Sequence, residues 1–338
     1  MKKKIYINPI SSNEDNHGLV NPYIDDLVSA LNPYFIVVNK GKSSTRGIID
    51  FLLHFRNTDY YYFNWIEKLP THKFGIIQTL LFLILIRIFK IAGKKIIWTM
   101  HNKLSHTRDK LLLKKIIFKA MLKYSDVILT HSSEGIDYGS CFNKKYAGKI
   151  CYFPHPVKDR RLSGTAAKIY DLLIWGSLAP YKGTHDFLKY LYDSGLDKVY
   201  RIYIVGKCVS EPYWKELQKF SGDSIRIENK FTDDEELCKL IRQSKIVLFI
   251  YSSPSVLGSG VLMDSLGYGA NIVGPDSGAF KDLGKENLIE TFTGFDDLIN
   301  KIDRQLASDG FNSSNHLTAN FLNENSWDKF AEKLYHIL

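Results

Sequence analysis

Short apolar runs alternate with helix-patterned segments along the first half of the chain. Strands are predicted where apolar and aromatic residues stand together, and helices where apolar residues recur every three or four positions. The first apolar run leads through a polar, glycine-bearing loop into a helix pattern over 23–31. Predicted strands cover 4–8, 34–38, 60–63, 95–99 and 127–130. This alternation indicates a mostly parallel sheet with helices on both faces.

The same alternation starts again after the proline-containing segment 153–156. Strands are predicted at 171–175, 200–205, 224–228, 246–250 and 271–273, with helices near 183–193, 211–220, 233–243 and 260–268. The polar run 158–167 makes a natural linker. We therefore predict an α/β chain with domains at 1–160 and 161–325, followed by a helix at 326–338 whose apolar residues Trp327, Phe330, Ala331, Leu334 and Leu338 share one face.

The apolar segment 75–92 resembles a membrane span at first sight. Gln78, Thr79, Arg87 and Lys90 interrupt it, and the unbroken apolar core runs only from Leu80 to Ile86. Roughly 20 predominantly apolar residues are needed to cross a bilayer. The pattern favours a core helix of the first domain, with a helix partly sunk in a membrane interface and a true span as alternatives.

Composition changes this picture mainly through charge. Residues 1–160 hold 25 Lys and Arg against 12 Asp and Glu, net +13, whereas the remainder holds 20 against 24, net −4. An anionic partner is therefore expected for the first domain only, either nucleic acid or an acidic membrane surface. The 338 residues contain four cysteines without C-x-x-C spacing, and no small-residue cleavage site follows the lysine-rich start. These features predict a cytosolic chain with reduced thiols.

The cationic excess is concentrated between Arg87 and Lys123, where eleven Lys and Arg accompany one acid, Asp109. Five lysines fall at helical spacing opposite an apolar face made by Leu112, Leu113, Ile116, Ile117 and Ala120; they are Lys110, Lys114, Lys115, Lys119 and Lys123. A cationic amphipathic helix suits an anionic membrane surface. The alternative is a solvated face of an internal helix. Nucleic acid is not expected, because the second half is acidic and lacks a recognition motif.

A small-residue turn opens an apolar helix near residue 260. Gly258, Ser259 and Gly260 can bring bare backbone N–H groups to the helix start, where the helix dipole favours an anion such as phosphate. Asp264 lies just over one turn further along and suits a ribose hydroxyl. These residues predict a nucleotide-sugar site, against the alternative of an ordinary helix with a glycine entry.

A second turn with phosphate-binding character lies in the same domain. The strand ending at Trp175 is followed by Gly176 and Ser177, and Lys182 stands just before a helix pattern. A lysine at a helix entry is a point charge suited to a diphosphate, and Ser177 can donate to the same group. A surface lysine in a loop is the alternative interpretation.

Taken together, the chain resembles the glycosyltransferase family 4 branch of the GT-B nucleotide-sugar transferases over nearly its whole length. The matching pieces appear in the same order. They are 21–23 (NPY), 98–102 (WTMHN), 130–132 (THS), 153–156 (FPHP), 176–183, 231–237 (FTDDEEL), Tyr251, 258–275 and Trp327.

The resemblance implies two Rossmann-like domains facing across a cleft, with the acceptor held by the first and the donor by the second, and a last helix that packs back toward the first domain. It assigns donor-diphosphate binding to Ser177 and Lys182, backbone amides to Ser259, Gly260 and Val261, and the ribose to Asp264. Phe231 is expected near the base, Gly18 at a close approach to the phosphates, and His101 toward the transferred sugar.

One departure from the family and one gap affect the expected chemistry. The family often has two glutamates separated by seven residues, and Val256 and Asp264 stand at those positions here. No side chain is a firm catalytic base. In the retaining enzymes that the chain resembles, the departing diphosphate oxygen is thought to deprotonate the acceptor, so Lys182 and the 258–260 turn carry the catalysis, with His101 as a candidate for proton transfer. No metal site or other cofactor is expected, because Asp and His are not clustered.

These expectations describe a metal-independent hexosyltransferase on the inner face of a bacterial cell membrane. It is predicted to transfer a sugar from a nucleotide-sugar to a membrane-associated, lipid-linked saccharide in surface-polysaccharide biosynthesis. The alternatives are a nucleotide-sugar epimerase or hydrolase on the same fold, and a non-catalytic membrane-bound subunit of an assembly complex.

Overall fold

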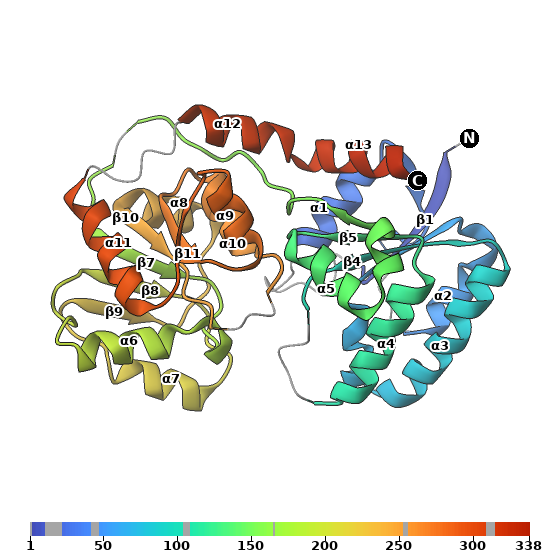
Figure 1. The fold of residues 1–338 in the computed structure, drawn as a ribbon, viewed down its shortest axis with the longest axis horizontal. Coiled ribbons are helices and arrows are strands. Elements are labelled where there is room, and N and C mark those ends of the chain that lie inside the picture. The colour runs from blue at the N-terminus through green and yellow to red at the C-terminus, as the bar shows by residue number, and fades with distance from the viewer. Residues whose placement is uncertain are drawn as a thin grey trace. The chain divides into compact units, whose positions relative to one another are not determined.

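The chain forms two compact units in the computed structural model. The structure describes residues 2–10, 22–41, 47–103, 109–164, 166–252, 256–308 and 315–338. The first unit comprises Met1–Pro156, Ser255–Gly258 and Asn325–Leu338, and the second comprises Val157–Pro254 and Ser259–Glu324. Each unit is built around its own six-stranded sheet (Figure 1).

The sheet of the first unit is entirely parallel, in the order β2-β1-β3-β4-β5-β6. Its strands are rich in β-branched and aromatic residues, and β3 is buried along its whole length. The bounds are β1 Lys3–Asn8, β2 Phe35–Val37, β3 Tyr60–Asn64, β4 Lys95–Met100, β5 Val127–Thr130 and β6 Ile150–Tyr152.

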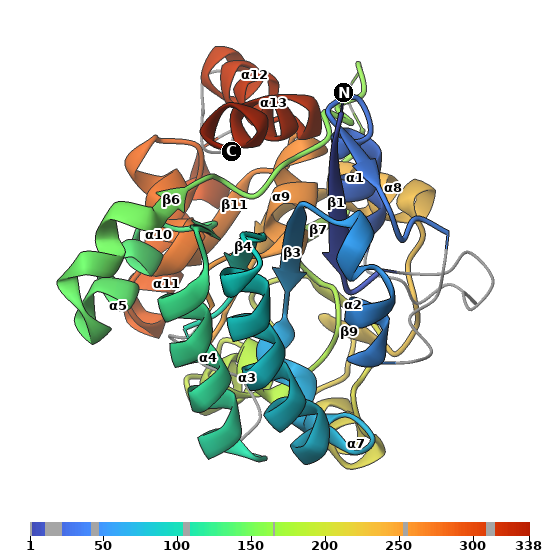
Figure 2. The same cartoon turned by 90° about the vertical axis from the view of Figure 1, so that its right-hand side faces the viewer.

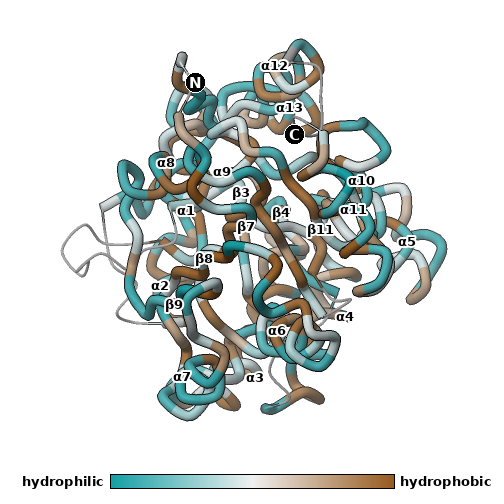
Figure 3. The backbone as a smooth tube through the Cα atoms, turned by 90° about the vertical axis from the view of Figure 1, so that its left-hand side faces the viewer, coloured by the Kyte–Doolittle hydropathy of each residue, from teal (hydrophilic) through white to brown (hydrophobic). Residues whose placement is uncertain are grey.

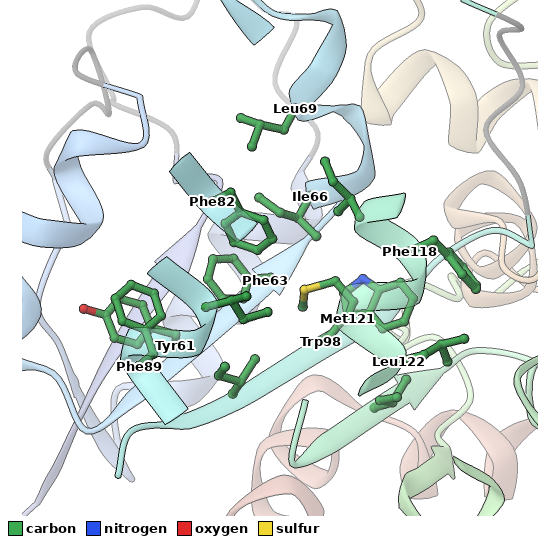
Figure 4. Close-up of a cluster of buried hydrophobic side chains, with 14 of the residues drawn as sticks. Tyr61, Phe63, Ile66, Leu69, Phe82, Phe89, Trp98, Phe118, Met121 and Leu122 are labelled. Carbon is green, nitrogen blue, oxygen red and sulfur yellow. The ribbon is translucent and has the colours of Figure 1, made fainter. Parts of the chain in front are cut away.

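Helices cover both faces of this sheet. They are α1 Pro22–Leu31, α2 Ile49–Leu53, α3 Gly75–Ile91, α4 Leu111–Tyr124, α5 Glu134–Phe142 and α13 Trp327–Ile337, with 3-10 turns η1 Phe55–Asn57, η2 Ile66–Thr71 and η3 Lys144–Lys149. On one face, a core rich in aromatic residues packs against α3 and α4 (Figure 4), and the rings of Tyr61 and Phe89 stack with centroids 4.1 Å apart. On the other face, Phe330, Ala331 and Leu334 of α13 pack against α1. The last helix therefore packs on the first unit, as predicted.

The second unit repeats the plan with the parallel order β12-β11-β10-β7-β8-β9. Hydrophobic strands run through its centre and more polar helices surround them (Figure 3). The strands are β7 Tyr170–Trp175, β8 Ile202–Val205, β9 Ile225–Glu228, β10 Ser244–Leu248, β11 Ile272–Pro275 and β12 Glu290–Phe292. The helices are α6 Thr184–Asp193, α7 Glu211–Gln218, α8 Asp234–Gln243, α9 Gly260–Gly267, α10 Gly278–Lys285, α11 Phe295–Ala307 and α12 Asn315–Glu324, with the 3-10 turn η4 Pro180–Lys182.

The sequence pattern missed the two short edge strands β6 and β12. Each has three residues, too few for an alternating pattern to stand out. Each is the terminal strand of its sheet and pairs with one neighbour only. The extended conformation of β6 and β12 is therefore set by pairing with β5 and β11, respectively, and not by a local sequence pattern.

Helix α3 lies half in the core and half on the surface. Phe82, Leu85, Ile86 and Phe89 are buried, whereas Ile77, Leu80, Ile84 and Ile91 are more than half exposed. In the part of the chain that the structure describes, no helix is both long and apolar enough to cross a membrane. Of the three interpretations of segment 75–92, the core helix explains the buried face of α3 but not its exposed aliphatic face.

Helix α4 lies beside α3 (Figure 2), in an orientation that the charge pattern did not predict. Lys114 was expected on the cationic face that meets the membrane, but it is only 3% exposed and does not lie on that surface. Leu112 and Ile116, which the pattern placed on the apolar face, are 72% and 38% exposed. The pattern failed because it assumed that every lysine is exposed, whereas the ammonium of Lys114 interacts electrostatically with Asp109 and with the buried carboxyl of Glu67.

Candidate functional site

The carboxyl ends of β7 and β8 meet at two glycines in the second unit. Gly176 follows β7 with φ +98°, and a Cβ there would lie 3.1 Å from Cγ1 of Val261 and 3.5 Å from Nζ of Lys182. A Cβ on Gly206, which follows β8, would lie 1.7 Å from the carbonyl oxygen of Gly176. Only glycines allow these backbones to approach so closely. In parallel α/β sheets, ligands bind at this edge.

Lys182 extends over this edge from η4. The following residue, Gly183, has φ +73°, and a Cβ there would lie 2.1 Å from the carbonyl oxygen of Ile250, so the turn that presents Lys182 requires glycine. The Nζ atom of Lys182 lies 4.9 Å from the ring centroid of Tyr251. Burial alone would lower the pKa of Lys182, but Tyr251 and Tyr181 outweigh it and raise the pKa overall. The ammonium is therefore charged at neutral pH.

The start of α9 completes this group of residues. Ser259 is the N-cap, and its hydroxyl accepts from the Leu262 amide at 3.3 Å and bonds the Tyr251 hydroxyl at 3.1 Å. Gly260 and Val261 follow. The backbone N–H groups in the first turn of a helix have no carbonyl partner within the helix, so they can donate to a ligand. We call Gly176, Lys182, Tyr251, Ser259 and Val261 the lysine site. It brings together the two turns that the sequence pattern had identified separately.

Asp264 lies one turn further along α9, next to an arginine that sequence reasoning missed. Its Oδ1 is 3.4 Å from Nη1 of Arg160, whose guanidinium also lies 3.6 Å from the carboxylate of Asp234 and over the ring of Tyr268. The Asp264 side chain remains 37% exposed. Arg160 lies in the polar run that was interpreted only as a linker, so its charge gave no signal of a position beside Asp264.

The other predicted donor residues have simpler surroundings. Ser177 is exposed beside Gly176, and Phe231 is exposed, at 64%, shortly after β9. Gly18 lies outside the described residues. Gly258 belongs to the first unit, where a Cβ would lie 2.9 Å from Cβ of His131, so packing against that histidine explains this glycine. Val256, at the position of the family's first glutamate, is buried and forms a β-bridge with Asn102.

Three histidines gather around Tyr23 at the carboxyl edge of the first sheet. The rings of His101 and His155 lie 5.3 and 5.0 Å from that of His131. The Tyr23 hydroxyl is 3.2 Å from Nε2 of His131, whose Nδ1 is 2.9 Å from the Phe153 carbonyl oxygen. Burial and the neighbouring imidazole of His155 lower the pKa of His131 to about 3. Burial likewise lowers the pKa of His155 to about 4 and that of His101 well below its ordinary value.

His101 is held in a fixed orientation within this cluster. Its ring stacks on Trp65 with centroids 4.2 Å apart, and its Nε2 is 3.0 Å from Oδ1 of Asn64. Because an amide oxygen only accepts, Nε2 donates and Nδ1 keeps its lone pair. His101 is therefore a neutral imidazole, suited to accepting a hydrogen bond. Across the described ranges, no three His, Cys, Asp or Glu side chains are grouped so as to hold a metal ion.

Comparison with known proteins identifies the fold of the chain. No protein-family model and no curated protein matches the sequence. HepE from Anabaena, solved with UDP, superposes with a TM-score of 0.72 at 12% identity over 99% of each chain. A glycosyltransferase from Rickettsia africae has a TM-score of 0.65 at 13% identity, covering 99% of this chain and 97% of its own.

The chain has the GT-B glycosyltransferase fold. A third GT-B structure, AviGT4 of avilamycin A biosynthesis, has a TM-score of 0.60 at 14% identity, covering 99% of this chain and 96% of its own. The two parallel six-stranded sheets are the two Rossmann-like halves of this GT-B chain. The lysine site lies in its second half and the histidine cluster in its first.

Proposed function

We propose that this GT-B protein is a glycosyltransferase that uses a nucleotide-sugar donor. The observation that carries the proposal is the lysine site, in which Gly176, Lys182 and the start of α9 meet at the carboxyl edge of a parallel sheet. A charged ammonium and helix N-terminal amides are complementary to a diphosphate. HepE, which shares the fold, has been solved with UDP and with UDP-glucose, which supports the same ligand class here.

The lysine site assigns a role to each donor-binding residue. Lys182 and the amides of Gly260 and Val261 bind the diphosphate and stabilise the charge that develops on it as the sugar leaves. Asp264, oriented by Arg160 and partly exposed, accepts from a ribose hydroxyl. Ser177 donates to the diphosphate, and Phe231 lies near the base.

We propose a metal-free transfer with retention of configuration. The bond between the anomeric carbon and the diphosphate oxygen breaks, and a new bond forms to the acceptor oxygen. The acceptor proton passes to the departing diphosphate, whose negative charge Lys182 offsets. His101, neutral and fixed by Trp65 and Asn64, orients the sugar through a hydrogen bond to its Nδ1.

We further propose that the acceptor is a lipid-linked saccharide at the inner face of a bacterial membrane, in surface-polysaccharide biosynthesis. The exposed face of α3 presents a row of aliphatic side chains: Ile76, Ile77, Leu80, Leu81, Ile84, Ile88 and Ile91. Beside it, α4 exposes Leu112 and Ile116 together with Lys115 and Lys119. Aliphatic groups that enter the acyl boundary, flanked by lysines that meet anionic headgroups, are typical of a membrane-surface helix.

Nucleotide-sugar recognition is tested by thermal unfolding with a panel of UDP- and GDP-sugars. A ligand bound only by the folded state raises stability by RT ln(1 + [L]/Kd), so about 2.7 kcal/mol is expected at 100 times Kd. We expect one nucleotide series to raise Tm, and the same donor to be consumed only when a saccharide acceptor is added. Turnover without acceptor would instead indicate an epimerase or hydrolase, and no Tm shift with any donor would contradict the proposal.

Membrane binding is tested by flotation with vesicles of phosphatidylcholine and phosphatidylglycerol. The double variant L80N/I84N, which changes two exposed positions of α3, is expected to lower the bound fraction at least tenfold because it removes apolar area from the bilayer contact. The control V199N/V209N makes the same kind of change at two exposed positions of the second unit. Equal flotation of the two variants, or no flotation of the unaltered protein, contradicts the proposed surface.

A further inference from the structure

A cavity of about 290 Å³ lies in the first unit, separate from the residues assigned above to the donor. Elements η2, α4 and α5 and the segment after β4 supply its walls. The lining residues are Glu67, Asn102, Lys103, Leu111, Lys114, Lys115, Phe118, Lys119, Tyr138 and Phe142. We call this cavity the α4 pocket.

The polar half of the α4 pocket is cationic. Four lysines line it: Lys103, Lys114, Lys115 and Lys119. Lys103 Nζ lies 2.5 Å from Glu134, whereas Lys115 and Lys119 are exposed one helical turn apart on α4. Like charges this close repel one another, so an anion in the pocket would relieve an unfavourable arrangement.

Among the lining residues named above, one is an acid, Glu67 of η2. Glu67 is only 8% exposed, and among the described residues its buried Oε2 has no hydrogen-bond partner. Burial raises its pKa to about 7, despite the nearby Lys68 and Lys114. A protonated carboxyl can donate to an anionic oxygen, and a buried polar atom without a partner is rare in native proteins. Glu67 therefore points to a ligand that supplies an acceptor.

The opposite half of the pocket is apolar. The ring of Phe118 lies 5.6 Å from that of Tyr138 and 5.5 Å from that of Phe142, which is 41% exposed. Leu111 continues this wall along α4. The next residue on the helix, Leu112, belongs to the exposed apolar surface proposed to meet the membrane. An elongated apolar group would thus contact the aromatic wall while its charged end meets the lysines.

We infer that the α4 pocket binds the phosphate ester of a long-chain alcohol or lipid. The lysines bind the phosphate, Glu67 donates to it, and the Phe118–Tyr138–Phe142 wall contacts the first part of the chain. This inference deepens the proposed membrane-held acceptor and rests on it for its biological role. Binding of the phosphate ester is measured without nucleotide-sugar and without turnover. Failure of the α4 pocket to bind it is therefore distinguished from failure of the proposed sugar transfer.

The test is calorimetry of the full chain with octyl phosphate below its micelle concentration. We expect octyl phosphate to bind at least tenfold more tightly than octanol or inorganic phosphate. The variant K115Q/K119Q is expected to weaken octyl phosphate at least tenfold, because it removes two pocket charges. The control K123Q/K144Q makes the same change in charge at exposed positions outside the lining and is expected to bind as the unaltered protein does.

Further measurements distinguish a lipid phosphate from free inorganic phosphate and test the contribution of the apolar wall. Phe142→Ala is expected to weaken octyl phosphate but not inorganic phosphate. Equal binding of inorganic and octyl phosphate would overturn the inference, since it would show a simple anion site. It would also be overturned if K115Q/K119Q reduced binding only to vesicles containing phosphatidic acid, because the lysines would then act through surface charge alone.

Discussion

Replacing Lys182 by alanine is expected to weaken nucleotide-sugar binding at least tenfold and to slow sugar transfer at least a hundredfold. Lys182 is a charged group held against Tyr251 at the helix entry, and the diphosphate gains negative charge as the glycosidic bond breaks. Its interaction is therefore stronger in the transition state than with the bound donor. A hundredfold loss in rate corresponds to about 2.7 kcal/mol.

Two measurements check this expectation. Calorimetry with the nucleotide-sugar gives the loss in binding, and steady-state transfer gives the loss in kcat. Lys189→Ala on α6 is the matched control, because Lys189 is exposed and pairs with Asp193 away from the lysine site. Equal donor affinity and equal kcat in K182A and K189A would show that Lys182 does not contact the diphosphate.

The lysine site was partly predictable from the sequence because glycine constraints are local. Gly176 and Gly183 mark turns whose geometry excludes a Cβ, and such turns flank Lys182 in the sequence. The sequence identified this turn and the 258–260 turn separately, and the structure brings Gly176, Lys182 and Val261 together. Arg160 could not be found this way, since its position beside Asp264 depends on how the segment after Val157 passes α9. That contact is long-range, and a polar run carries no periodic signal of it.

Helix α4 shows where charge patterning fails. A lysine on a helix is usually exposed, so Lys114 was placed on the cationic face expected to meet the membrane. The helix instead buries Lys114 near Glu67 and exposes Leu112 and Ile116. There the ammonium of Lys114 interacts electrostatically with Asp109 and with Glu67, which lies on a 3-10 turn from another part of the sequence. The exposed surface of α4 is consequently more apolar than the sequence pattern indicates.

The histidine cluster is expected to make the protein lose stability on mild acidification. His131 and His155, with pKa values near 3 and 4, stay neutral when folded but bind protons when unfolded below about pH 6.5. The unfolded state therefore holds more protons, and the free energy of unfolding falls as pH falls from 6.5 toward 4. Each histidine contributes a slope of about 1 kcal/mol per pH unit in this window.

Glu67 acts in the opposite direction over the same pH range. Its raised pKa, about 7, keeps it protonated when folded at a pH where the unfolded chain has released that proton. Its contribution to stability is present at low pH and is lost as pH rises through 7. Two variants should therefore change the slope with opposite signs: His131→Gln flattens the fall between pH 6.5 and 5, and Glu67→Gln steepens it.

Urea unfolding at half-unit steps between pH 7 and 5 measures both slopes. His72→Gln, a change at an exposed histidine outside the cluster, is the control and should leave the profile unchanged. The measurements stop at pH 5 because ion-paired carboxylates begin to bind protons at lower pH, which also destabilises the folded protein. Asp171 is one of them: burial would raise its pKa, but its bonds to Arg201 and Lys245 lower the pKa overall. Slopes that stay equal in H131Q and E67Q would contradict the assignment of a neutral histidine and a protonated glutamate to the folded first unit.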